Sequence, residues 1–82
     1  MPKSVFSPRY ERFRELLIQA RKDAGLTQSD LAVQLGRPQS YVSKYENGER
    51  RLDLIEFLDI ADILNIKVPT FLDDLLRHRP EL

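Results

Sequence analysis

The chain contains no cysteine, which excludes disulfide bonds, thiolate metal sites and a cysteine nucleophile. Its single histidine, His78, excludes a metal site built from several histidines. No apolar run is long enough to span a bilayer, and the sequence shows no signal peptide. The composition therefore predicts one cytoplasmic domain that has no cofactor, binds no metal and does not contact a membrane.

Alternation of apolar and polar residues, the pattern of a half-buried strand, is also missing. Apolar residues recur at helical spacing instead, so the sequence predicts an all-α bundle with a modest core. There is no Ser/His/Asp spacing and no glycine-rich loop that would cradle a phosphate. The sequence therefore gives no reason to expect an enzyme.

The formal net charge is zero, but the charges are unevenly distributed. From Arg9 to Arg51 there are nine basic and six acidic residues, whereas the chain from Leu52 onward has three basic and seven acidic residues. One half is therefore basic and the other acidic. An anionic partner would be attracted to the first half and repelled by the second.

A helix is predicted over residues 28–35. Thr27 can accept a hydrogen bond from the amide of Asp30, and the Asp30 carboxylate can reach back, which is the pattern of a capping box. Gly36 provides the left-handed conformation that ends a helix. The apolar residues at helical spacing are Leu31, Ala32 and Leu35.

A second short helix is predicted from Pro38 or Gln39 to about Tyr45, because proline is favoured where a helix begins. Val42 faces the core in this prediction. The residues left facing outward are polar: Gln39, Ser40, Ser43 and Lys44. Two helices joined by a tight turn, the second with a polar outer face, form the pattern of a helix-turn-helix.

Three further helices are predicted, giving five in total. The first runs from about Pro8, capped by Ser7, to Ala24. The fourth begins at Asp53 and ends near Leu64. The fifth follows Thr70 as its cap and runs from Phe71 to about His78. The expected inward stripe of the fourth helix is Leu54, Phe57, Leu58, Ala61 and Leu64, with Ile55, Ile60 and Ile63 as additional apolar positions. Residues 1–8 are interpreted as a flexible arm.

Two segments resemble the lambda-repressor-like, or Xre/Cro, family of DNA-binding domains. They are Gly25-Leu26-Thr27-Gln28-Ser29-Asp30-Leu31-Ala32 and Val42-Ser43-Lys44-Tyr45-Glu46-Asn47-Gly48, and they occur at the family's separation. The resemblance implies a compact five-helix lambda-repressor-like bundle. It assigns residues 9–66 to a helix-turn-helix DNA-binding domain, and we interpret residues 67–82 as a short C-terminal helix and a candidate dimerisation element.

The resemblance implies that Gln39 contacts a base, and glutamine can bind adenine through two hydrogen bonds. The other candidates for base contacts are Ser40, Ser43 and Lys44. The candidates for DNA backbone contacts are Gln28, Arg37, Tyr41, Asn47, Arg50 and Arg51. The alternatives are that Gln28 merely begins a helix and that the polar face is an ordinary solvated helix surface.

The resemblance also implies a structural salt bridge between Arg21 and Glu46, although both side chains could instead be solvated at the surface. Losing one member of a partly buried pair leaves the other charge uncompensated. A pair of this kind would tie the first helix to the end of the third.

The resulting functional prediction is a sequence-specific DNA-binding transcriptional regulator, a homodimer that reads a palindromic operator with its third helix in the major groove. The candidate dimer interface comprises Ile18, Phe71, Leu72, Leu75 and Leu76. These side chains could instead be consumed in the core of the monomer. The alternative function is an antitoxin-like or accessory protein-interaction module that binds a protein partner with its fourth and fifth helices.

Overall fold

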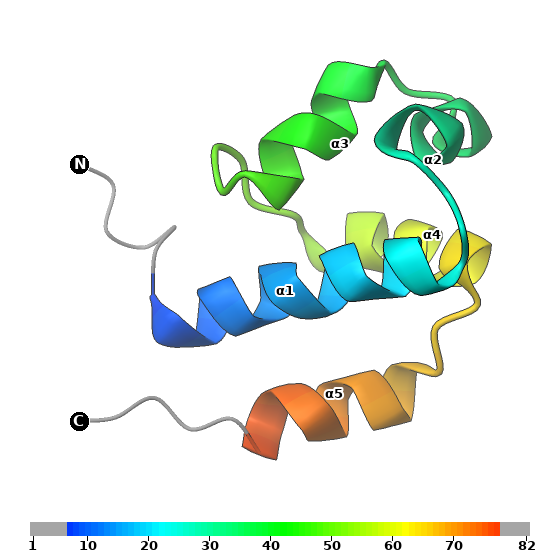
Figure 1. Ribbon diagram of the computed structural model, residues 1–82. Coiled ribbons are helices and arrows are strands. Elements are labelled where there is room, and N and C mark those ends of the chain that lie inside the picture. Colours follow the sequence, from blue (N-terminus) through cyan, green and yellow to red (C-terminus); the bar gives the residue numbers. More distant parts are fainter. Residues whose placement is uncertain (1–6, 78–82) are drawn as a thin grey trace.

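The computed structural model describes residues 7–77, and these residues form five α-helices and no strand (Figure 1). The helices are α1 (Pro8–Asp23), α2 (Gln28–Leu35), α3 (Gln39–Glu46), α4 (Leu54–Leu64) and α5 (Val68–Arg77). The all-α fold with five helices is therefore confirmed. The expected N-terminal arm falls mostly on residues 1–6, outside the described residues, and Pro8 already belongs to α1.

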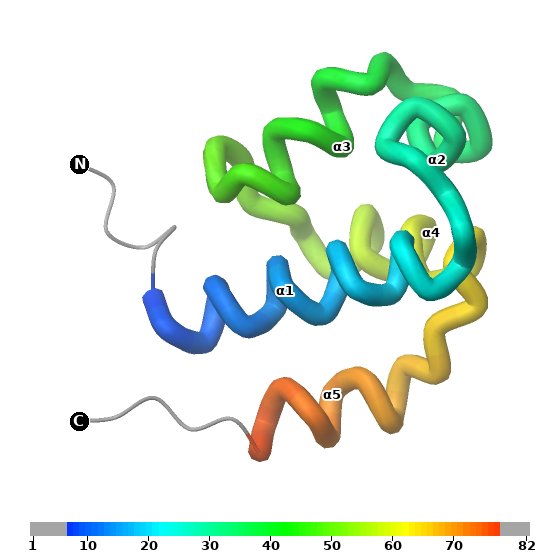
Figure 2. The backbone as a smooth tube through the Cα atoms, in the orientation of Figure 1, coloured from blue at the N-terminus to red at the C-terminus, as the bar shows by residue number. Residues whose placement is uncertain are grey.

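Helix α1 runs through the middle of the molecule, with α2 and α3 on one side and α5 on the other (Figure 1). The backbone trace shows that a single tight turn separates α2 from α3 (Figure 2). Helix α5 therefore lies across α1 from the helix-turn-helix. No helix of residues 7–77 has the length and apolar character needed to cross a membrane.

Local capping determines where the helices begin. The Thr27 side chain accepts from the Asp30 amide at 3.0 Å and Asp30 accepts from the Thr27 amide at 2.9 Å, so the predicted capping box is present. Asp53 and Glu56 form an equivalent box at the start of α4. Gly36 ends α2 with φ at +69°, a conformation that glycine adopts without a steric penalty.

The core is built from all five helices. Leu17, Leu31 and Val42 are almost completely buried and bring α1, α2 and α3 together. The rings of Phe13, Phe57 and Phe71 do the same for α1, α4 and α5, with centroid separations of 5.0 to 5.9 Å. Aromatic pairs at these distances contribute more to stability than the burial of their apolar surface alone.

The predicted inward stripe of α4 is partly wrong. Leu54 is 68% exposed and Leu58 is 40% exposed, whereas Ile60 is 0% exposed. The residues of α4 that are buried are Phe57, Ile60, Ala61 and Leu64. Phe57 packs against the aromatic rings of α1 and α5, as an inward residue should. Helix α4 also packs against α2, and its buried side includes Ile60 in place of Leu54 and Leu58.

The last helix also begins earlier than predicted. Helix α5 starts at Val68, so Thr70 lies inside it and Pro69 occupies its first turn, where proline is tolerated. Phe71 is buried in the core and cannot belong to an exposed interface. Leu72 and Leu76 remain exposed, while Ile18 and Leu75 are half-buried. The predicted last residue of this helix, His78, is outside the described residues.

Candidate nucleic-acid interface

Helix α3 has a polar face directed to solvent and an opposite face in the core. Gln39, Ser40 and Lys44 are exposed and Ser43 is half-buried, whereas Val42 is fully buried. The helix is short and follows the turn at Gly36. Its outer face is therefore available to a partner along its full length.

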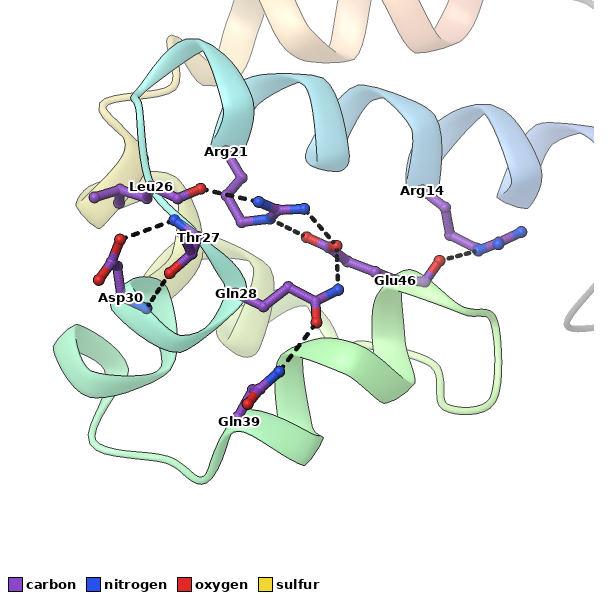
Figure 3. A network of polar contacts seen from close by, with 8 residues as sticks. All are labelled: Arg14, Arg21, Leu26, Thr27, Gln28, Asp30, Gln39 and Glu46. Carbon is purple, nitrogen blue, oxygen red and sulfur yellow. Dashed lines mark hydrogen bonds and ion pairs between the residues drawn. The ribbon is translucent and has the colours of Figure 1, made fainter.

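Behind this face lies a network of side-chain hydrogen bonds, which Figure 3 shows from close by. Arg21 of α1 donates to both carboxylate oxygens of Glu46 on α3, at 2.8 and 3.0 Å, and also to the carbonyl of Leu26 at 2.9 Å. Glu46 is only 4% exposed. The ion pair that the family resemblance implies is thus present, and the hydrogen bond with Glu46 raises the pKa of the Arg21 guanidinium.

The network continues from the ion pair to the first residue of α3. Gln28 donates to Glu46 at 2.9 Å, and its own carbonyl oxygen accepts from the Gln39 amide at 3.4 Å. The Ser29 hydroxyl donates to the Gln39 carbonyl oxygen at 3.1 Å. The candidate base-reading side chain is therefore connected through Gln28 to a buried charge pair.

Arg14 is a contributor that the sequence analysis missed. Its Nε donates to the backbone carbonyl of Glu46 at 3.0 Å, and its Nη1 pairs with Glu11 at 2.8 Å. The guanidinium also covers Gly48, where an added Cβ atom would lie 3.3 Å from it. A cation at the C-terminal end of a helix is favourable. Arg14 lies in the middle of α1, so no signal in the sequence points to its contact with the end of α3.

Tyr41 lies on the inward side of α3, and its predicted contact with the DNA backbone stays a prediction. It is 9% exposed, its ring packs edge-on against Tyr45, and the guanidiniums of Arg37 and Arg50 lie 4.6 and 4.9 Å from its centroid. Burial raises the pKa of the Tyr41 phenol. Positions 41, 42 and 45 together form an inward side of α3 that is wider than a single apolar stripe.

The loop after α3 is fixed to the rest of the molecule. Arg50 makes two hydrogen bonds to Glu56, at 2.9 and 3.2 Å, and these bonds lower the pKa of the Glu56 carboxyl. The Arg51 guanidinium lies 4.4 Å from the ring centroid of Tyr10, whose hydroxyl accepts from the Leu52 amide at 3.2 Å. Two of the predicted backbone contacts, Arg50 and Arg51, are thus anchored to neighbouring side chains.

A tight turn between two helices, with a polar outer face on the second, defines a helix-turn-helix DNA-binding protein. The model of the helix-turn-helix family matches residues 17–71. The solved structure of an XRE-family like protein from Pseudomonas syringae pv. tomato str. DC3000 superposes on this chain with a TM-score of 0.84. The two sequences are 46% identical, and the match covers 95% of each chain. A search of curated proteins found no match.

The chain belongs to the XRE family of helix-turn-helix proteins. At the level of the family it is a DNA-binding regulator, and the fold is not that of an enzyme. The expected family and fold are therefore confirmed.

Proposed function

We propose that the protein is a sequence-specific transcriptional regulator that reads DNA with α3 in the major groove. The observation that supports this most is the exposed row of Gln39, Ser40 and Lys44 on a helix whose other side is buried. The major groove of B-DNA admits an α-helix, and the N-terminal residues of such a helix reach the base edges. Gln39 is the first residue of α3. Ser43, half-buried one turn further along, would complete the reading face.

Phosphate contacts would hold α3 in register. Gln28 in the first turn of α2 and the exposed side chains of Arg37, Asn47 and Arg51 lie beside the reading helix in sequence and are suited to this role. Arg50 is engaged by Glu56 and covers the Tyr41 ring. We therefore assign Arg50 to holding the loop in place, so that a phosphate would have to compete with Glu56 for it.

A single small module makes few base contacts, so specificity favours two copies on a palindromic operator. Large apolar side chains are exposed on α4 and α5, namely Leu54, Ile55 and Leu58 on α4, and Leu72 and Leu76 on α5; on α2, Val33 is also exposed. Because α5 lies across α1 from α3, pairing through α5 would leave the reading face free (Figure 1). We propose that these side chains of α4 and α5, rather than Phe71, form the homodimer interface.

The test is to replace Gln39 by alanine and to measure affinity for a selected site and for random DNA. Gln39→Ala should weaken binding to the selected site by about 1–3 kcal/mol and should change binding to random DNA much less. Gln34→Ala, the same change at an exposed position on α2, is the matched control. Equal losses on both kinds of DNA would remove Gln39 from the base-reading set.

A further inference from the structure

The Glu56 side chain binds two partners at once, because it lies in the first turn of α4 and also faces the loop that precedes this helix. Its Oε1 accepts from the Asp53 amide at 2.9 Å, and the Asp53 carboxylate accepts from the Glu56 amide at 2.8 Å. These two bonds form the capping box of α4 and do not involve Arg50. The position of the Glu56 carboxylate is therefore set by the start of α4.

Arg50, in the loop after α3, is bound to this carboxylate through two hydrogen bonds. Its Nη1 donates to Oε1 at 3.2 Å and its Nη2 donates to Oε2 at 2.9 Å. Nη1 also donates to the backbone carbonyl of Arg51 at 3.0 Å, and the guanidinium lies 4.9 Å from the ring centroid of Tyr41. The Arg50 side chain is still 37% exposed, so a phosphate can reach it.

The carboxylate occupies an edge of the guanidinium that a DNA phosphate would otherwise use. Carboxylates and phosphates both bind arginine through two parallel N–H···O bonds, so the two groups exclude each other at one edge. A phosphate that took this edge would also bring its negative charge against Glu56, which the capping box holds in place. The ion pair therefore opposes a contact between Arg50 and the DNA backbone.

We propose that Glu56 is a positioning residue that acts as an intramolecular competitor for DNA phosphate: it withholds Arg50 from the DNA backbone and so limits the number of phosphates that one copy neutralises. The proposal rests on the proposed function, because it requires the loop after α3 to approach DNA. Each neutralised phosphate steepens the fall of log K with log salt concentration by about 0.9 for B-DNA. Binding that does not depend on sequence comes almost entirely from such contacts, so Glu56 keeps binding to random DNA weak.

The experiment measures affinity for random duplex DNA between about 0.05 and 0.2 M salt, for the native protein and for Glu56→Gln. Glutamine can replace glutamate in a capping box, so α4 keeps its cap. The glutamine carbonyl then faces Asp53, and its NH₂ group meets the Nη2 donor of Arg50, which releases the arginine. Over this salt range the variant should lose about 3.5-fold more affinity than the native protein, the amount expected for one additional phosphate contact.

Two controls separate this effect from a general change in charge. Asp59→Asn removes the same charge from an exposed position three residues further along α4 and should leave the salt slope unchanged. Combining Glu56→Gln with Arg50→Ala tests whether the effect passes through Arg50. Arg50→Ala alone should leave the native slope unchanged, and adding Glu56→Gln to it should change nothing further.

A native slope in Glu56→Gln, or a slope that steepens equally with and without Arg50, would overturn the inference. A shallower slope in Arg50→Ala alone would also overturn it, because Arg50 would then already bind phosphate in the native protein. None of these results affects the proposed base reading, which Gln39→Ala tests on a selected site. A native protein that prefers no selected site to random DNA would contradict the proposed function alone, and one that binds no duplex would contradict both.

Discussion

At the scale of single residues, Glu46 joins three helices. It lies on α3, its carboxylate accepts from Arg21 of α1 and Gln28 of α2, and its backbone carbonyl accepts from Arg14. A buried carboxylate is strongly unfavourable unless it is paired and hydrogen-bonded. The Arg21–Glu46 pair therefore contributes less as a net source of stability than as a constraint on the placement of α3.

The burial of the Arg21–Glu46 pair can be tested by removing one partner and measuring the free energy of unfolding. Arg21→Ala should lower the free energy of unfolding by about 3–5 kcal/mol, because Glu46 would remain buried without its counter-charge. Arg77→Ala breaks a solvent-exposed pair with Asp73 and should lower it by only about 0–1 kcal/mol. Urea unfolding of the three proteins measures both values. Similar losses for the two variants would mean that the Arg21 pair is solvated.

Tyr45 makes stability depend on alkaline pH. It is almost completely buried, and burial raises the pKa of its phenol. The folded state therefore holds the proton more tightly than the unfolded state, whose phenol titrates near pH 10. The stabilisation is fully present below about pH 10 and is lost as the pH rises further. Urea unfolding at about pH 9 and pH 11 should show a larger loss for the native protein than for Tyr45→Phe; equal losses would contradict this account.

Contacts that a family motif implies could be predicted from the sequence, whereas contacts that no motif marks could not. The Arg21–Glu46 pair followed from the family resemblance, since 25 positions separate the two residues and no local rule joins them. Arg14 reaches the end of α3 across 32 positions, and no motif marks it. Tyr41 was a candidate for a DNA backbone contact, and the burial of its ring against Tyr45 could not be deduced from its polar neighbours in the sequence.

At the scale of helices, local sequence signals predicted the helix ends wherever the two residues of a capping interaction lie three positions apart. The capping box at Thr27 and the termination of α2 at Gly36 occur where the sequence predicts them, and α4 begins directly after Asp53, as expected. Each depends only on backbone geometry within one helical turn. The boundaries of α2, and with them the position of the turn before α3, could therefore be predicted closely.

The Thr27 cap should have a measurable contribution to stability. Thr27→Ala removes the acceptor for the Asp30 amide and should lower the free energy of unfolding by about 1 kcal/mol. Thr27→Ser keeps the acceptor and should restore most of that loss. Thermal unfolding of both variants provides the comparison. A Thr27→Ala protein as stable as the original would show that α2 is held by packing alone.

In helix α4 the spacing of apolar residues fails to predict which side chains are buried. Apolar residues occupy more than one of its sides, so periodicity alone could not choose between Leu54 and Ile60 as core residues. The buried side of α4 is set by packing against helices distant in sequence, through the contacts of Phe57 with Phe13 and Phe71 and through the packing of α4 against α2. Contacts of this kind cannot be deduced from spacing within one helix.

At the scale of the whole molecule, exposed leucines on α5 predict self-association. Leu72 is 43% exposed and Leu76 is 60% exposed. Replacing both by serine should convert a dimer into a monomer in sedimentation and should weaken binding to a full palindrome much more than to a half-site. Val33→Ser, at an exposed apolar position on α2, is the control.

The outcome also separates the two functional hypotheses. A dimer that survives both substitutions would place the interface elsewhere on the molecule. A native protein that is monomeric and binds no selected site would instead favour the protein-interaction module, because the exposed apolar side chains of α4 and α5 would then be available to a different partner.

Selection of binding sites from random DNA by the native protein and by Gln39→Ala tests the central claim most directly. The account predicts a palindromic consensus with half-sites about one helical turn, roughly 34 Å, apart and an adenine in each half-site that becomes degenerate in the variant. Failure to enrich any sequence, or the same consensus from both proteins, would contradict it.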